Sequence, residues 1–486
     1  IMATYVNDLR LKEIATGDES GTWGTSTNTN LELIGEAWGS GSETITGTSH
    51  TITIADGTSD AARAYSLTLA GSITATNTVT LAPNTVNKTW IIQNSAGYQV
   101  TISQGTGANV VIPNGGIKMV VADGAGGGAA VTDVMDMTGG TGNVGLGSGN
   151  LGTAITTGTD NVAIGEASLD AVTTGSDNTA VGDNAGGALT TGGNNVAIGS
   201  GALLVATTAA DNTAIGTLAL TANSSGTDNT AVGYAAGDAN TTGSDNTFIG
   251  DNAGGANTTA ANNTAVGSGA LLVNTTVAYN VAVGAGAGTA ITGGSGYTTA
   301  IGYAAGAAIT TAGKNTLIGG QSGDALTTGN SNVAVGYNTL TTDTLGDRNV
   351  AIGNQALENQ NFTSSTDSYN TAVGFHAGLA NTTGIQNTLI GGLAGDAITT
   401  SNYTVAVGYN AAGSSTTGHS NSVLGRQALF NNTTGSQNVA VGRDSLEANT
   451  TASNNTAVGF HALVANTTGG DNTAIGKDAL DSNTTG

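Results

Sequence analysis

Histidine and acidic side chains are the residues of this chain best suited to hold a metal ion or to catalyse a reaction. The histidines are His50, His376, His419 and His461. His376 and His461 each follow a phenylalanine and occupy the same position of an internal repeat, five periods apart. Equivalent repeat positions explain this similarity, and neither histidine has a carboxylate or a second imidazole at the spacing of a metal site. The sequence therefore predicts no metal site and no catalytic residue.

A row of aspartates inside the repeat is the second candidate for chemistry. In consecutive coils these carboxylates would stack about 5 Å apart, where like charges repel or recruit a cation. Other coils carry Lys314, Arg348 or Tyr403 at the same position, so we interpret the row as solvated turn carboxylates, with calcium as the minor alternative. We expect no cofactor. The aspartates are Asp160, Asp177, Asp211, Asp228, Asp245 and Asp471.

Composition excludes several classes of protein and partner. The chain has 33 acidic and 10 basic residues, a net charge of −23, so it lacks the basic stripe that a phosphate backbone requires. It has no cysteine and no apolar run long enough to insert into a membrane. No Ser–His–carboxylate set and no concentrated pairing of carboxylates with aromatic platforms is visible. We therefore expect neither an enzyme, nor a nucleic-acid-binding protein, nor a membrane-inserted one.

The elements that carry these residues form an internal 17-residue repeat. The pattern Asn-Thr-Ala-Val-Gly recurs, and its glycine, called the anchor glycine here, occurs 20 times between Gly147 and Gly476. Successive anchor glycines are 17 positions apart, except for two steps of 18 and one of 21, where Asn361–Ser364 predicts a longer loop. A fixed period of this length is typical of a solenoid, here a parallel β-solenoid or β-roll of about 20 coils. At about 4.8 Å per coil it would make a shaft of about 95 Å.

Each repeat carries one short strand with two apolar faces. Val, Ile or Leu always precedes the anchor glycine, and Val, Thr or Ser stands two places earlier. The predicted structural positions are Val181, Gly182, Ile198, Gly199, Ile215, Gly216, Val232 and Gly233, with an asparagine side-chain ladder at Asn178, Asn195, Asn212 and Asn229. We expect the β-branched residues to fill the coil. The residue between them, Ala in 15 of 20 repeats, would then face outward as an inter-chain contact at Ala180, Ala197, Ala214, Ala231, Phe248, Ala265 and Ala282. A second or third copy would cover this face, so the sequence favours a homotrimer. A monomeric solenoid with an alanine-lined surface is the alternative.

The region before the repeats is different in kind. Thr29 and Glu32 fit a capping box that opens a short helix with Leu31, Ile34 and Trp38 on one face, stopped by Gly39. Alternating segments from residue 43 onward predict a small β-domain, and the glycines of 124–128 with those of 138–140 predict a junction. The predicted organisation is an attachment segment (1–42), a β-domain (43–137) and the repeat array (138–486).

Two resemblances add to this interpretation. The repeat Asn-Thr-Ala-Val-Gly resembles the head β-roll of trimeric autotransporter adhesins. The runs 3–11, 16–24 and 27–34 are similar to the amino-terminal region of bacteriophage tail fibre proteins, and this likeness extends over the N-terminal region ahead of the repeat array. It implies a structural fibre subunit located in the virion and assembled in the host cytoplasm. Its amino end would attach to tail or baseplate proteins, and its far end would meet a host surface receptor.

Alternatives remain at this point. A bacterial cell-surface trimeric adhesin or filament protein is the main one. An ice- or surface-binding solenoid would need a regular row of Thr-x-Thr, which Ala, Ser and Gly interrupt here. The chain ends shortly after Gly476, within a repeat. Since an open coil exposes unpaired strand edges, we expect the natural protein to continue into a receptor-binding tip.

Overall fold

The computed structural model describes residues 5–6, 8–14, 21–135, 142–147, 149–151 and 155–486. The chain forms two compact units, Ile1–Ala210 and Asp211–Gly486. The first contains an N-terminal helix, a small β-domain and the first coils of the array, and the second contains the remaining coils. The predicted fold class is confirmed: mostly β, with one short helix, a β-domain and a parallel β-solenoid of 17-residue repeats. Within the described residues, no helix combines the length and apolarity needed to span a bilayer.

The N-terminal helix is longer than predicted. Strands β1 (Tyr5–Val6) and β2 (Leu11–Lys12) pair antiparallel ahead of α1 (Trp23–Ala37). The predicted capping box at Thr29 is wrong, because the helix begins at Trp23 with Thr22 as its N-cap residue. Thr27 fits inside the helix because its hydroxyl donates to the Trp23 carbonyl at 2.9 Å. The helix ends at Ala37, just before the predicted stop at Gly39.

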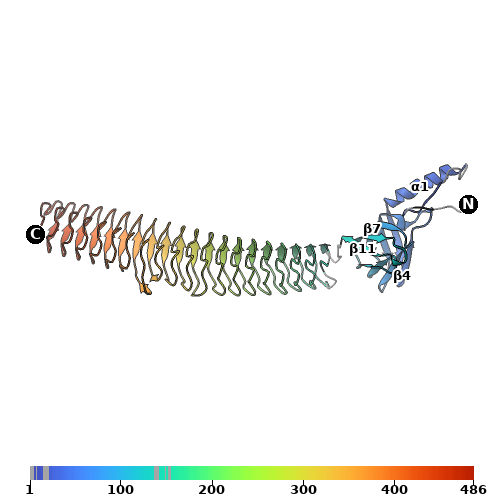
Figure 1. The fold of residues 1–486 in the computed structure, drawn as a ribbon, viewed down its shortest axis with the longest axis horizontal. Helices are drawn as coiled ribbons and strands as arrows, with labels where there is room; N and C mark the ends of the chain where they lie inside the picture. Colours follow the sequence, from blue (N-terminus) through green and yellow to red (C-terminus); the bar gives the residue numbers. More distant parts are fainter. Residues whose placement is uncertain (1–4, 7, 15–20, 136–141, 148, 152–154) are drawn as a thin grey trace. The chain divides into compact units, whose positions relative to one another are not determined.

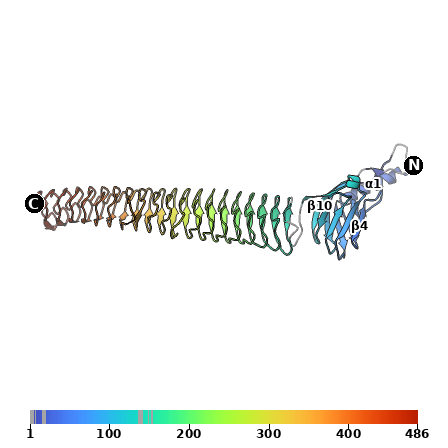
Figure 2. The same cartoon turned by 60° about the horizontal axis from the view of Figure 1, so that its bottom comes forward.

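The β-domain is itself a short solenoid. From β3 to β8 successive strands alternate between two sheets, of order β11-β10-β7-β5-β3 and β4-β6-β8-β9. The neighbours β3, β5 and β7 run parallel, as do β4, β6 and β8, while β9, β10 and β11 add antiparallel strands. Figure 2 shows β4 and β10 in the separate sheets. The bounds are β3 (Ser40–Ile45), β4 (Ser49–Thr53), η1 (Ala61–Arg63), β5 (Ser66–Gly71), β6 (Asn77–Ala82), β7 (Asn87–Ser95), β8 (Val100–Ser103), β9 (Val110–Ile112), β10 (Ile117–Asp123), η2 (Gly126–Gly128) and β11 (Val131–Met135).

The core of this domain lies between the two sheets. Inward residues alternate with outward ones along β5 and β7, and Leu67, Trp90 and Ile92 are at most 1% exposed. The Trp90 indole N–H donates to the carbonyl of Ala62 at 2.7 Å, so the ring is buried without an unpaired donor. The expected junction at 124–128 is wrong, because these residues form η2 and lead into β11 within the domain. Most of the second expected junction segment lies outside the described residues.

The repeat array supplies 20 strands of three residues each. In each unit every strand pairs in parallel with the strand of the next repeat, and like positions face one another, as in Thr230↔Thr247, Ala231↔Phe248 and Val232↔Ile249. Figure 1 shows the coils of the second unit, from green to red, stacked in single file. The first unit holds β12 (Val144–Leu146), β13 (Val162–Ile164), β14 (Thr179–Val181) and β15 (Val196–Ile198).

The second unit holds the remaining strands of the array and one side pair. The predicted longer loop is confirmed: β24 (Gly346–Asp347) and β26 (Thr366–Asp367) pair in parallel beside it and project from the stack in Figure 1. The array strands are β16 (Thr213–Ile215), β17 (Thr230–Val232), β18 (Thr247–Ile249), β19 (Thr264–Val266), β20 (Val281–Val283), β21 (Thr299–Ile301), β22 (Thr316–Ile318), β23 (Val333–Val335), β25 (Val350–Ile352), β27 (Thr371–Val373), β28 (Thr388–Ile390), β29 (Val405–Val407), β30 (Ser422–Leu424), β31 (Val439–Val441), β32 (Thr456–Val458) and β33 (Thr473–Ile475).

The two faces of the array strands are the reverse of the prediction. The expected inter-chain residues line the inside of the coils, each at most 2% exposed: Ala180, Ala197, Ala214, Ala231, Phe248, Ala265 and Ala282. The β-branched residues before the anchor glycines lie outside, with Ile198 and Ile215 each 36% exposed. The prediction failed because side chains from another segment of the repeat fill the interior of the coil. Leucines at the fourth place after an anchor glycine, such as Leu203 and Leu271, fill the coil from a segment that sequence patterns indicate as a turn, so a methyl group suffices on the strand.

Inside the coils, a large side chain on the strand is compensated by a small residue at the fourth place after the anchor glycine. Where the strand carries Phe248, the fourth place after the anchor glycine is Gly254, and a Cβ there would lie 2.4 Å from the phenyl ring. The anchor glycines have a different requirement. Gly233 has φ of +138°, and a Cβ on it would lie 2.5 Å from the carbonyl oxygen of Gly250 in the next coil. The recurring glycine is thus imposed by close coil stacking.

Candidate functional site

A buried asparagine ladder runs through the coils, as predicted. Asn229 donates from Nδ2 to Oδ1 of Asn212 at 3.1 Å and to the carbonyl of Gly243 at 2.9 Å, and its Oδ1 accepts from the backbone N–H and the Nδ2 of Asn246. The four predicted members are at most 2% exposed: Asn178, Asn195, Asn212 and Asn229. Because these amides are fully engaged with neighbouring coils, they hold the array together and offer no group to a ligand.

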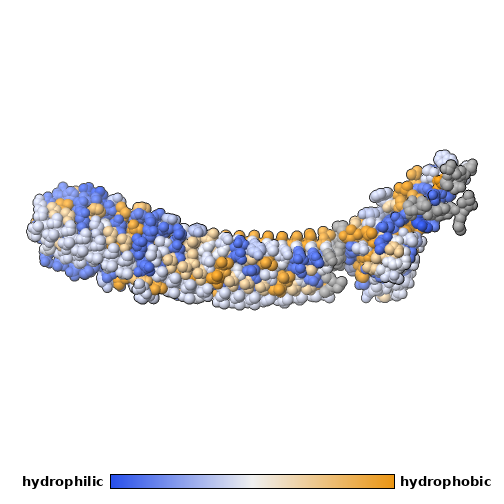
Figure 3. All heavy atoms as spheres, viewed as in Figure 1, coloured by the Kyte–Doolittle hydropathy of each residue, from blue (hydrophilic) through white to orange (hydrophobic). Residues whose placement is uncertain are grey.

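The outer surface of the strands is a flat apolar face. We call it the outer sheet face: the Val, Ile or Leu before each anchor glycine together with the Thr, Val or Ser two places earlier. Ile249 and Ile390 are each 38% exposed and Leu424 is 52% exposed. Figure 3 shows hydrophobic residues in a line along the strand side of the stack. The predicted positions Val181, Ile198, Ile215 and Val232 lie on this face, each as the last residue of its strand. The predicted anchor glycines follow them directly: Gly182, Gly199, Gly216 and Gly233.

The aspartate row lies on turns with left-handed backbone. Asp228 has φ of 59° and Asp245 has φ of 58°, and Lys314 and Tyr403 adopt 60° at the same position in other coils. The backbone conformation thus recurs while the side chain varies. Among the described residues, no three His, Asp or Glu side chains come together in a way that would hold a metal ion.

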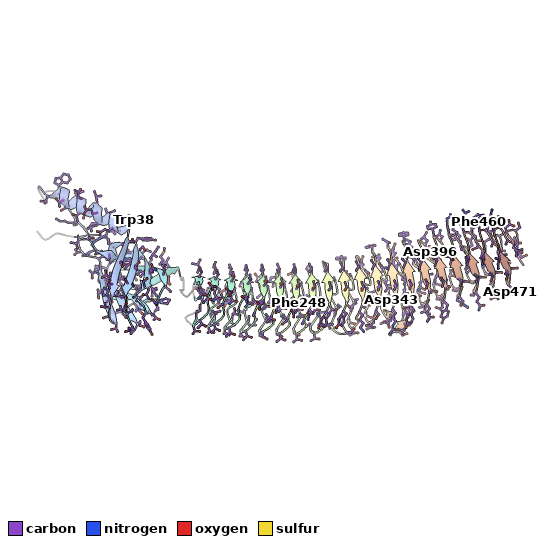
Figure 4. All side chains as sticks on the ribbon, turned by 180° about the vertical axis from the view of Figure 1, so that it is seen from behind. Trp38, Phe248, Asp343, Asp396, Phe460 and Asp471 are labelled. Atoms are coloured by element: carbon purple, nitrogen blue, oxygen red, sulfur yellow. The ribbon has the colours of Figure 1, made fainter. Side chains whose placement is uncertain are left out.

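Two of the histidines pack against their phenylalanines. The Phe375 and His376 rings stack at 3.6 Å, and Phe460 and His461 stack at 3.7 Å. His461 also lies 3.4 Å from the carboxylate of Asp444. Phe460 and Asp471 lie on opposite edges of the stack in Figure 4.

Asp444 gathers several cations near the last coils. Its carboxylate is 2.7 Å from Nε of Arg443 and 3.8 Å from Arg426, in addition to His461. The Asp444 side chain is only 8% exposed. The contacts of Asp444 with Arg426 and His461 join consecutive coils, whereas Arg443 is its neighbour in the sequence.

Burial shifts the pKa of several groups outside the predicted sites, among them Asp343 and Lys88. Burial raises the pKa of the Asp343 carboxyl, although Nε2 of Gln360 donates to it at 2.7 Å and the N–H of Gly346 at 3.0 Å. In the β-domain, burial and the nearby Arg63 lower the pKa of Lys88 to about 8. Its ammonium lies 5.3 Å from the centre of the Trp90 ring and donates to the carbonyls of Arg63 and Ala64. These contacts lie within the β-domain, so we assign Lys88 a structural role.

An exposed aromatic row follows the anchor glycines and was missed by sequence reasoning. It comprises Tyr303, Tyr337, Phe375 and Tyr409, each directly after an anchor glycine and between 52% and 68% exposed. The signal for it was a shared repeat position, visible once the repeats are aligned on their anchor glycines. Proximity in the sequence gave no indication, because neighbouring members of the row are two coils apart.

A second exposed apolar surface lies on helix α1. Leu31, Ile34 and Trp38 are spaced by three and four positions and share one face, and they are 61%, 36% and 80% exposed. Figure 4 shows Trp38 at the end of the helix. The opposite side is held in place by the buried Leu33 and by Asn30, whose amide bonds the backbone of Lys12 at 3.1 and 3.2 Å.

The array therefore presents an apolar sheet face and an aromatic row, and the helix presents a separate apolar face. Functional interpretation rests on these surfaces, because the cores of both units are occupied by their own side chains. Comparison with protein-family models, with curated proteins and with solved structures finds no match to this chain.

Proposed function

We propose that this chain is a structural fibre subunit of the bacteriophage tail fibre type. Its solenoid would serve as a shaft, its N-terminal region would attach to tail or baseplate proteins, and a region distal to the array would meet the host receptor. The observation that carries the proposal is the outer sheet face, which repeats in every coil and is partly exposed in the single chain. A long apolar face of this kind favours association with further copies.

The argument for a trimer still applies, although the strand face that would be covered by other copies is the opposite of the predicted one. One apolar face fills each coil and the other needs a cover, and three copies around a common axis would cover all three outer sheet faces. The acidic composition suits separate fibres, because a charge of −23 per chain makes assembled fibres repel one another in solution.

The N-terminal helix supports the attachment role. Leu31, Ile34 and Trp38 lie on the side of α1 that the rest of its unit leaves exposed. An exposed tryptophan is typical of an interface anchor, and the leucine and isoleucine extend the apolar patch around it. They also lie within the segment whose sequence is similar to the amino-terminal region of tail fibre proteins.

Light scattering tests the assembly. We expect the mass of the purified chain to be three times 47.0 kDa. Ile249→Asp should reduce it, because a carboxylate would be buried in the contact. The matched control is Val273→Asp, at 36% exposure against 38% for Ile249 and outside the outer sheet face. A wild-type mass of 47.0 kDa would contradict the trimer.

Immunogold electron microscopy tests the location. Antibodies raised against the purified chain should label thin appendages of tailed particles in lysates of the source culture. Label on the cell envelope instead would favour a cell-surface adhesin. Label on neither structure would contradict both functions.

A further inference from the structure

The aromatic row has a regular spacing along the second unit. Tyr303, Tyr337, Phe375 and Tyr409 occupy every second coil, and Gly320, Asn354 and Gly392 take the same position in the coils between them. With about 4.8 Å between coils, neighbouring rings are about 10 Å apart. This is close to the length of a disaccharide unit in an extended polysaccharide.

The intervening glycines let the rings lie against the wall of the solenoid. A Cβ on Gly320 would be 3.5 Å from Cδ2 of Tyr337, and a Cβ on Gly392 would be 3.6 Å from Cδ2 of Tyr409. Each tyrosine thus leans over the preceding coil and occupies the space that a larger side chain would take there. The ring rests on backbone on one side and remains about half exposed, at 53% for Tyr337 and 52% for Tyr409.

Amide side chains stand beside part of the row. They stand two places after the anchor glycine, all with left-handed backbone, in two coils that carry a ring (Asn338 and Asn410) and in two coils between rings (Gln321 and Gln355). The Oδ1 atom of Asn338 is buried and has no hydrogen-bond partner. Gln355 is held in place by His376, 2.7 Å away, and by Glu358, which accepts from its Nε2 at 2.7 Å. Gln355 is thus engaged within the protein, so the row offers a ligand its flat apolar rings with Gln321 and Asn410 beside them.

We propose that the aromatic row binds an extended neutral polysaccharide along the array. Sugar rings have one apolar face of C–H groups that stacks on an aromatic ring, and hydroxyls at their rim that suit amide partners. A net charge of −23 disfavours an acidic polymer, and the basic residues that follow the row at the same repeat position, Arg426, Arg443 and Lys477, each contact an aspartate. The inference does not depend on the fibre function, since it needs only the solenoid of a single chain.

A second set of exposed tyrosines on the same array offers a matched comparison. Tyr279 and Tyr297 lie on the turns that precede their strands and stack on each other at 5.1 Å with an interplanar angle of 4°. The guanidinium of Arg348 covers Tyr369 at 5.6 Å. These rings are about as exposed as the aromatic row, but each has another side chain against its ring, so they make poorer platforms than Tyr303, Tyr337 and Tyr409. Phe375, whose ring stacks on His376, is left out of the test for the same reason.

Native gel electrophoresis through polysaccharide tests the proposal. The intact chain is run in gels containing hydroxyethylcellulose, galactomannan, laminarin or dextran, all neutral polymers. We expect retardation in at least one gel. The variant Tyr303→Ser, Tyr337→Ser, Tyr409→Ser should raise the dissociation constant in that gel by about tenfold or more. The control variant Tyr279→Ser, Tyr297→Ser, Tyr369→Ser should retain the wild-type value.

Three outcomes would overturn the proposal. The first is migration of the wild type that no polymer alters, and the second is equal retardation of the two variants. The third is a lower mass of the aromatic-row variant in light scattering, which would make the rings a contact between copies. Circular dichroism confirms that both variants fold. If the wild type is a trimer but binds no polymer, only the polysaccharide-binding proposal is refuted. If it is a monomer that binds a polymer, only the trimer is refuted.

Discussion

Replacing Asn229 by alanine should destabilise the array at one defined place. The substitution leaves the backbone N–H of Asn246 without its acceptor, and it removes one donor to the carbonyl of Gly243. It also breaks the side-chain bonds to Asn212 and Asn246, both 3.1 Å long. Asn229 itself is 1% exposed, so water has no ready access to the groups left behind.

The magnitude follows from the Asn246 N–H, because the carbonyl of Gly243 keeps Nδ2 of Asn240 as a donor at 3.0 Å. A buried donor left without a partner lowers the free energy of unfolding by about 1–3 kcal/mol. In a solenoid each coil contacts only its neighbours, so the loss stays local. It should appear mainly in the coils that carry Asn212, Asn229 and Asn246.

Hydrogen exchange with mass spectrometry measures this directly. Peptides covering residues 226–246 should exchange about tenfold to a hundredfold faster in Asn229→Ala, since about 1.4 kcal/mol corresponds to about tenfold. The control is Asn252→Ala, whose amide only donates to the exposed Asp251 at 3.1 Å and whose position is alanine at Ala235 in another coil. Equal exchange in the two variants would refute the ladder as a source of stability.

Three further predictions concern packing and charge. Gly254→Ala should lower the denaturation midpoint far more than Gly269→Ala, because a Cβ at Gly254 meets Phe248 at 2.4 Å whereas nothing lies within 4 Å at Gly269, and equal midpoints would contradict this. Asp343→Asn should stabilise the chain at pH 7: its raised folded pKa means that stability is lost as pH rises through that value, and a thermal midpoint that falls would oppose this reasoning. Lys88 has the opposite sign, because its folded pKa of about 8 lies below 10.5, so the free energy of unfolding should rise from pH 8 to 10.5 in wild type and rise less in Lys88→Met, as denaturant titrations at each pH would show.

Several elements could be predicted because local pattern and stacking agree. Like residues recur every 17 positions, and parallel strands in register bring like residues together, so the asparagine ladder followed directly from the period. The β-domain strands followed from alternation, as Leu67 and Leu69 illustrate. The helix start was less predictable, because Thr27 bonds back to Trp23 and makes a polar stretch compatible with helix.

The direction in which each coil closes was decided only by the tertiary structure. A strand whose two faces are both apolar does not indicate which face is inside, and the deciding volume came from Leu203 and its equivalents, held in left-handed conformations that resemble turns in sequence. The same closure brings Tyr303, Tyr337 and Tyr409 into one row, although they are far apart along the chain. The sequence alone thus determined the period, the strands and the ladder, because these depend on repetition. The tertiary structure decided which strand face is buried, which is exposed and which side chains line up on the surface, because these depend on how a whole coil fills its own interior.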